Sequence, residues 1–397
     1  MSDVFGDLVG QDEAVETLRR AAASAARIVD GSAAGNGAMT HAWIFTGPPG
    51  SGRSVAARAF AAALECERAG AGCGECHGCH TVLGGTHADV RFVVPEGLSI
   101  GVGEMRALVL RAGTAPSGGR WQAVVISDAD RLTEAAGNAL LKAVEEPPPR
   151  TVFLLCTPST HPDDISVTIR SRCRVVPLRQ PSAEAVAEVL VRRDGVPPEV
   201  AAWAAAAAQG HVGRAKRLAR DAEARSRREA VLAVPRRLTG VGACFDAASA
   251  LIAATEAESG AAFQETDSAE RAALEQALGA GGTGRGAAGA VRGMAGQIRD
   301  LEKRQRSRAT RSQRDALDRA LVDLAGFYRD VLITSLRASV AVVHTDTAAQ
   351  SAAAAERWSP ESTLRRIEAV LACRDAIDQN VKPRIAVEAM MVTLWRG

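Results

Sequence analysis

Four cysteines in one short stretch are the residues whose chemistry is plainest in this sequence. They follow the spacing C-x6-C-x2-C-x2-C at Cys66, Cys73, Cys76 and Cys79, with glycines between them. Thiolates are preferred ligands of Zn²⁺, and glycine permits the tight turns that bring four ligands onto one ion. The spacing therefore predicts a structural, tetrahedral Zn²⁺ module at residues 66–79.

Other uses of these cysteines remain open at the level of the sequence. His77 or His80 could replace one thiolate, and the group could be free or redox-active thiols. A catalytic zinc is disfavoured, because four protein ligands would leave no open position. The other four cysteines are scattered and are expected to be small buried apolar residues: Cys156, Cys173, Cys244 and Cys373.

A glycine-rich loop is the second chemical feature. The stretch Gly47-Pro-Pro-Gly50-Ser-Gly52-Arg53-Ser54 follows an apolar stretch and matches the phosphate-loop pattern G-x-x-x-x-G-K-[ST], except that Arg53 replaces lysine. Such glycines let backbone N–H groups surround a phosphate at a helix N-terminus. Ser54 could ligate Mg²⁺. The loop thus predicts a binding site of nucleotide type, for ATP or ADP with Mg²⁺.

Two departures indicate that this site does not turn nucleotide over. The planar guanidinium of Arg53 is larger than a lysine ammonium and does not substitute for it against β- and γ-phosphates. After the apolar run 124–126, Asp128 can hold Mg²⁺, but Ala129 stands where a hydrolase would place a water-activating glutamate, and Asp130 is one position too far along. We expect slow or absent hydrolysis, with the loop kept as a fold element or as a non-hydrolysing nucleotide site.

The elements around these residues predict an α/β fold. Five short apolar strands are expected at 42–45, 90–94, 123–126, 152–156 and 174–176, with helices at 12–28, 54–64, 103–111 and 134–144 between them. Alternation of this kind predicts a mostly parallel sheet with helices on both faces, here within residues 1–180.

The rest of the chain is expected to be helical. Residues 181–235 predict a small helical lid with a break at Gly210–Gly213. Residues 236–298 are Ala/Gly-rich and are interpreted as a partly flexible connection, with a flexible loop at 279–289. Residues 299–397 predict an all-α domain, in which Leu317, Leu321, Leu324 and Tyr328 share one helix face.

Length and composition limit the classes of protein. A chain of 397 residues suits two or three domains, and its net charge of +2 does not by itself mark a nucleic-acid binder. No basic-then-apolar signal pattern and no run of about 18 apolar residues occurs, so a cytoplasmic protein without a membrane segment is expected.

Six stretches together resemble the AAA+ clamp-loader ATPases. They occur in the family's order: residues 5–11 (FGDLVGQ), 138–147 (NALLKAVEEP), Thr157, 171–173 (SRC), 210–215 (GHVGRA) and 380–388 (NVKPRIAVE). The NALLK…EEP helix followed by SRC is the more specific part and is similar to bacterial clamp loaders of DNA polymerase III. Because the lysine and the glutamate are missing, the chain resembles the delta-prime class of these subunits.

The resemblance implies a fold and a set of roles. It implies an AAA+ parallel-sheet domain with a helical lid and an all-α collar domain. It implies adenine-side contacts by Val9 and Gly10, a sensor 1 at Thr157, a sensor 2 at Arg214 and an arginine finger at Arg172. It also implies structural zinc.

The partners that the resemblance implies are gamma/tau and delta subunits, a sliding clamp and primer–template DNA. A contact with the template backbone falls at Arg106, on the first turn of a predicted helix, although a solvated arginine is an equal alternative there. The basic stretch Arg299–Arg319 is interpreted as a solvated face or a collar contact.

Three functions remain to be distinguished. The first is a non-hydrolysing clamp-loader subunit that acts on a neighbour's ATP site. The second is an active gamma/tau-like motor, which Ser54 and Asp128 favour and which Arg53 and Ala129 oppose. The third is another AAA+ protein, such as a helicase loader or a Holliday-junction motor, which the cysteine module and the NALLK…SRC combination disfavour.

Overall fold

The computed structural model describes the chain except for residues 1–2, 33–36, 69–71, 114 and 278–286, together with the side chains of 287–295. The chain divides into two compact units. One comprises residues 1–95 and 99–219, and the other comprises residues 96–98 and 220–397. No helix in the described part of the chain is long and apolar enough to cross a membrane.

A five-stranded parallel sheet forms the centre of the first unit. Its strands are β1 (Ala42–Thr46), β2 (Val90–Val93), β3 (Gln122–Ile126), β4 (Thr151–Thr157) and β5 (Arg174–Pro177), in the order β2-β3-β4-β1-β5. The pairs β2–β3, β3–β4, β4–β1 and β1–β5 are all parallel. The predicted strands and the α/β fold class are therefore confirmed.

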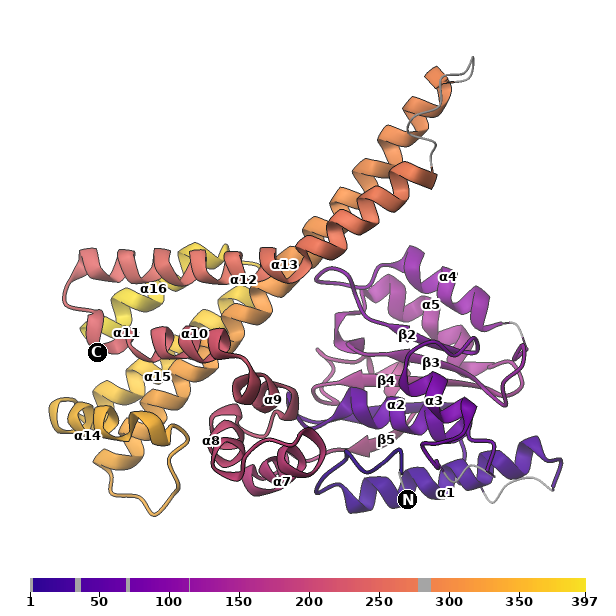
Figure 1. Ribbon diagram of the computed structural model, residues 1–397, viewed down its shortest axis with the longest axis horizontal. Coiled ribbons are helices and arrows are strands. Elements are labelled where there is room, and N and C mark those ends of the chain that lie inside the picture. The colour runs from indigo at the N-terminus through magenta and orange to yellow at the C-terminus, as the bar shows by residue number, and fades with distance from the viewer. Residues whose placement is uncertain (1–2, 33–36, 69–71, 114, 278–286) are drawn as a thin grey trace. The chain divides into compact units, whose positions relative to one another are not determined.

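Helices cover both faces of this sheet, which explains why its strands are apolar throughout (Figure 1). Trp43 and Phe45 point into a core shared with α1 (Asp12–Val29) and α2 (Arg53–Leu64). The alternate residues, Ala42 and Ile44, point into a second core with α4 (Val102–Ala112) and α5 (Glu134–Glu145). The remaining elements are short: α3 (His77–Leu83), the 3-10 turn Ala129–Arg131 and α6 (Val167–Arg170).

Three helices follow the sheet within the first unit. They are α7 (Ala183–Asp194), α8 (Pro198–Ala208) and α9 (Val212–Arg220), and they correspond to the start of the predicted lid. The Ser182 hydroxyl caps α7 by accepting a hydrogen bond from the Ala185 N–H at 3.2 Å. Gln209 and Gly210, at φ of 50° and 79°, form the predicted break between α8 and α9.

The second unit is all helical. It contains α10 (Ala222–Leu232), α11 (Val234–Arg237), α12 (Val241–Ala277), α13 (Ala287–Ser335), the 3-10 turn Thr345–Thr347, α14 (Ala348–Arg357), α15 (Pro360–Asp378) and α16 (Pro383–Arg396). The residues predicted to share one face of α13 are at most 1% exposed and lie in its core: Leu317, Leu321, Leu324 and Tyr328.

The Ala/Gly-rich segment 236–298 differs from the expected flexible connection. Over its described residues it is mainly helical, because α12 runs from Val241 to Ala277 and α13 begins at Ala287. Alanine has the highest helix propensity, so an alanine-rich stretch favours a helix where scattered glycines suggested a loop. The helical unit accordingly begins near residue 220 instead of 299. Most of the loop expected at 279–289 lies outside the described residues.

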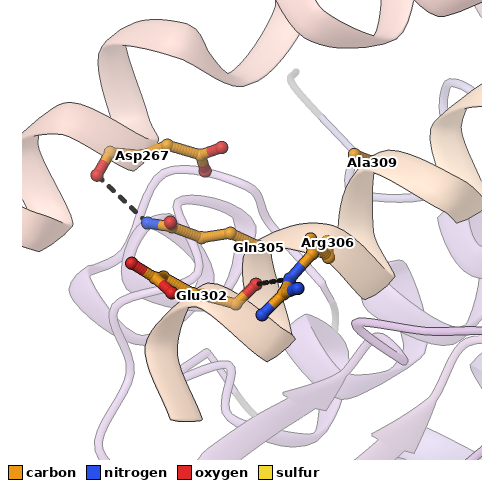
Figure 2. A pocket seen from close by; sticks show the side chains of 5 residues that line it. All are labelled: Asp267, Glu302, Gln305, Arg306 and Ala309. Carbon is orange, nitrogen blue, oxygen red and sulfur yellow. Dashed lines mark hydrogen bonds between the residues drawn. The ribbon is translucent and has the colours of Figure 1, made fainter. Parts of the chain in front are cut away.

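Charged side chains join the long helices α12 and α13. Arg308 pairs with Asp267 and Glu270, and Arg271 lies 3.4 Å from Glu302. Figure 2 shows Gln305 donating to the Asp267 carbonyl, at 3.0 Å, beside a hollow of about 350 Å³. The carboxylates of Asp267 and Glu302, which line this hollow, therefore already pair with arginines of α12 and α13.

A buried ionic network holds the second unit together. Arg228 of α10 is 3% exposed, and its guanidinium binds the Asp346 carboxylate and lies 3.7 Å from Asp323 of α13. Asp330, fully buried, accepts the N–H groups of Val343 and His344 at 2.9 and 2.8 Å. The network therefore fixes the segment before α14 against α13 and α10.

Removal of the Arg228 guanidinium should strongly destabilise the second unit. Arg228→Met leaves the Asp323 carboxylate buried without its cation, which costs about 3–5 kcal/mol in the free energy of unfolding. Chemical denaturation monitored by circular dichroism measures this loss. Arg236→Met, at an exposed position, is the matched control and should change stability by less than about 0.5 kcal/mol. Equal stabilities of the two variants would contradict the role of the network.

Candidate functional site

The four predicted zinc ligands converge in the structure. The Sγ atoms of Cys66, Cys73, Cys76 and Cys79 all lie within 4.8 Å of one another. This separation fits a tetrahedron around one ion with S–metal distances near about 2.3 Å. No other group of three or more such ligands is found among the described residues.

Backbone N–H groups donate to three of the four cysteine sulfurs. The N–H groups of Cys73, Cys76 and Cys79 donate to the sulfurs of Cys66, Cys73 and Cys76, at 3.5, 3.4 and 3.5 Å. Burial raises the pKa of the Cys73 thiol, but N–H donation from Glu75 and Cys76 outweighs it and lowers that pKa to about 7. The donor set therefore suits a metal that binds thiolates, and Zn²⁺ fits it.

Two glycines are required by the geometry of this module. Gly72 has a φ of +65°, and a Cβ there would meet Cγ2 of Val4 at 2.7 Å. Gly78 lies so close to the carbonyl oxygen of Glu65 that a Cβ could not be accommodated. Glycine is therefore required at these two positions for steric reasons as well as for tight turns.

The glycine-rich loop connects β1 to α2 with the geometry of a phosphate cradle. Gly47, Gly50 and Gly52 have φ values of 157°, 89° and 90°, and Gly52 is the N-cap of α2. A Cβ on Gly50 would lie 2.8 Å from the Cα of His211, so the lid packs directly on this loop. The first turn of α2 therefore presents free N–H groups at the end of a sheet strand.

Two polar atoms of the loop fit an anionic ligand. Among the described residues, neither the buried Ser51 Oγ nor the buried Nη1 of Arg53 has a hydrogen-bond partner. Buried polar atoms without partners are costly and often mark a ligand position. Ser54, in contrast, is exposed on α2. These residues fit a phosphate group, while the Arg53 guanidinium takes the place of the usual ammonium.

The acidic strand end lies beside the loop but lacks a water-activating carboxylate. Asp128 follows β3, and Ala129 is 2% exposed and packs into the core with α4 and α5. Burial raises the pKa of Asp130, and Arg53 is among the charges that act on it. Arg53 and Asp130 are therefore near enough for their charges to interact, and a core methyl group stands at position 129.

The two sensor positions are already bonded within the chain. Thr157 is fully buried at the end of β4, and its hydroxyl donates to the Ser159 carbonyl at 3.0 Å. The backbone N–H of Arg214, on the first turn of α9, donates to Nδ1 of His211 at 3.2 Å. Both residues lie on elements near the glycine-rich loop, and their sensor roles stay predictions.

Arg172 lies apart from this group. It precedes β5, and its guanidinium contacts Glu145 at 2.7 Å and the Thr168 carbonyl at 2.9 Å. The two charged side chains are 38% and 44% exposed. In a parallel sheet, a residue before β5 lies at the edge opposite to the loop after β1, so Arg172 and the chain's own glycine-rich loop are not brought together.

The N-terminal stretch ends at Gln11, a residue for which no role was predicted from the sequence. Val9 is partly buried and Gly10 has a φ of +70°, but neither makes a bonded contact that identifies a ligand. Gln11 is 5% exposed and bonds to the backbone of Arg179 at 2.5 and 3.0 Å. The sequence signal that could have identified Gln11 is its place directly before a helix, where Ser or Asp is the usual N-cap. Arg106 is exposed on α4, so its DNA contact stays a prediction.

Comparison with known proteins matches the first unit. Residues 27–182 match the family model described as DNA polymerase III, delta subunit. The chain is 33% identical over 184 residues to DNA polymerase III subunit tau of Bacillus subtilis, covering 46% of this chain and 30% of that protein. It is 39% identical over 163 residues to subunit delta' of Pseudomonas aeruginosa, covering 40% of this chain and 49% of that protein.

A solved structure also aligns along the chain. A DNA polymerase III gamma subunit-related protein from Thermotoga maritima covers 95% of this chain and 99% of its own, with 14% identity and a TM-score of 0.40. The chain spans at most about half the length of the curated relatives described above. The matched region carries the glycine-rich loop, the cysteine module and the SRC motif. Through this region, the chain is similar to DNA polymerase III clamp-loader subunits of the tau and delta' kinds.

Proposed function

We propose that this chain is a subunit of the DNA polymerase III clamp loader of the delta-prime kind, which supplies Arg172 to the ATP site of a neighbouring gamma/tau subunit. In this proposal the complex also contains a delta subunit, and it loads a sliding clamp on primer–template DNA. The chain does not hydrolyse ATP itself. Zinc has a structural role in residues 66–79.

The position of Arg172 relative to the sheet is the observation that carries the proposal. β1 and β5 pair in parallel from Trp43–Arg174 to Thr46–Pro177. At about 3.3 Å per residue, the glycine-rich loop and Arg172 are therefore more than roughly 10 Å apart along the strand direction. An arginine so placed cannot act on a phosphate in its own loop, but its exposed side chain can act on a ligand of another subunit.

The contacts of Arg172 would allow its guanidinium to leave Glu145 for a ligand of another subunit. An ion pair between two partly exposed side chains contributes only about 0–1 kcal/mol. Exchange of the Glu145 carboxylate for a phosphoryl group therefore costs little. The guanidinium then stabilises the negative charge on the transferring γ-phosphoryl group, as an arginine finger supplied in trans does.

An active gamma/tau-like motor is the alternative that the comparisons leave open. The relatives include tau as well as delta' subunits at similar identity, so the comparisons do not separate the two kinds. Arg53 and the buried Ala129 oppose this alternative. ATP turnover by the isolated chain separates them.

The isolated chain should hydrolyse ATP no faster than a buffer blank. Its loop lacks the lysine, and no carboxylate stands at position 129 to activate water. Phosphate release from purified chain, with and without primer–template DNA, measures this. A chain preparation that turns over ATP, and loses that turnover on Asp128→Ala, would establish the motor alternative instead.

Arg172→Ala should lower ATP turnover by the assembled complex. Loss of an arginine finger reduces turnover by about 10³–10⁵-fold in well-studied GTPases, and the reduction here is limited to the one site that this chain completes. Steady-state turnover of a complex assembled with gamma/tau and delta subunits is the measurement. Arg170→Ala, an exposed arginine two residues away, is the matched control. Normal turnover with Arg172→Ala, in a complex shown to be assembled, would rule out the finger.

The cysteine module should hold one zinc ion per chain. Elemental analysis of purified protein should show this stoichiometry, and Co²⁺ substitution should give the absorption of a tetrahedral thiolate site. Cys76→Ser should lower the metal content and the stability of the first unit, because metal binding contributes to folding. Cys373→Ser, outside the module, should keep the metal. Metal-free protein with unchanged stability would contradict the zinc assignment.

A further inference from the structure

The N-terminal residues 3–11, here called the strap, pass between three parts of the first unit. At one end, the Val4 N–H donates to the Gly72 carbonyl in the cysteine module at 3.0 Å. At the other end lies Gln11, whose side-chain amide reaches the glycine-rich loop and the segment that leads into the lid. The strap therefore contacts the metal module, the loop and the lid.

Gln11 makes a two-point contact with the backbone. Its Nε2 donates to the Arg179 carbonyl at 2.5 Å, and its Oε1 accepts the Arg179 N–H at 3.0 Å. The same Nε2 lies 3.5 Å from the Ser51 carbonyl. Because Gln11 is 5% exposed, water cannot easily replace these bonds. The amide also leaves α1 without a side-chain cap, although Gln11 is its N-cap residue.

The residues beside Arg179 continue these contacts to the lid and the loop. The Leu178 N–H donates to the Thr46 carbonyl at 2.7 Å, and the Leu178 carbonyl closes over Gly47. The Gln180 amide donates to the Gln209 carbonyl, at the break before α9. Residues 178–180 are thus bonded in turn to the loop, the strap and the lid.

Helix α7 is joined to the strap as well. The guanidinium of Arg192 donates to the Gly6 carbonyl at 3.2 Å, and Arg193 pairs with Asp7 at 3.0 Å. The lid is therefore fastened to the strap at its beginning, through Arg179, and at the end of its first helix.

We infer that the strap fastens the lid over the glycine-rich loop, and that Gln11 is the positioning residue that sets the junction at Arg179. Opening of the lid then requires the Gln11–Arg179 contact to break together with the contacts of Arg192 and Arg193 with the strap. This role is independent of the trans action of Arg172, because it concerns only contacts within this chain.

Local hydrogen exchange tests the role of Gln11. Gln11→Met keeps the length of the side chain and removes its polar atoms, and Gln11→Glu keeps the acceptor for the Arg179 N–H but loses the donor. In both variants of the full chain, peptides from α7–α9 should exchange about tenfold faster, since buried hydrogen bonds oppose local opening. Peptides from β1 and β4 should exchange at the unchanged rate. Gln264→Met, an exposed glutamine on α12, is the control.

Two outcomes would overturn the inference. One is unchanged exchange in α7–α9, and the other is an equal increase across β1, β4 and the lid, which would mean that Gln11 only stabilises the whole unit. If Gln11→Met does not fold, Asp7→Asn provides the same test at an exposed position of the strap. Loss of the ion pair with Arg193 should accelerate hydrogen exchange in α7 by about two- to fivefold. Unchanged exchange in α7 would also contradict the inference that the strap fastens the lid.

Discussion

The parallel register of β1 with β4 is the constraint on which the rest of the first unit depends. Thr46 pairs with Thr157, so the two strands end at the same level, and the Gly47 N–H donates to the Pro158 carbonyl at 3.2 Å just beyond them. Because β3 runs in the same direction beside β4, Asp128 also emerges at this edge. One hydrogen-bonded register therefore places the glycine-rich loop, Asp128 and Thr157 at the same edge of the sheet.

The same register separates the glycine-rich loop from Arg172 within the unit. Groups that would bind a nucleotide lie after the strands, whereas Arg172 lies before β5 and beside the end of α5, at Glu145. A change in the loop at one edge therefore need not disturb the Arg172–Glu145 ion pair at the other. The geometry thus explains how an incomplete loop and an exposed arginine of family type can coexist in one chain.

Much of this arrangement could be predicted from the sequence because its signals are local. Apolar runs marked the strands, glycine spacing marked the loop, and cysteine spacing marked the metal module. The contact of Gln11 with Arg179 could not be predicted, since it joins residues 168 positions apart through a side chain with no distinctive pattern. The helical nature of 241–277 was missed for another reason: its alanines favour a helix, and residues such as Cys244, Ala248 and Leu251 bury one face of it in the core of the second unit, a contact that is not local in sequence.

The two departures from an active site differ in how deeply they are built into the fold. Arg53 lies on the loop, and Nη1 of its guanidinium is free of hydrogen bonds within the described residues, so lysine could occupy this position without repacking. Ala129 is 2% exposed and belongs to the core between the sheet and α4 and α5. A glutamate there would have to bury its carboxylate or leave that core, and either change is costly. Packing therefore disfavours a glutamate at position 129, whereas position 53 carries no such constraint.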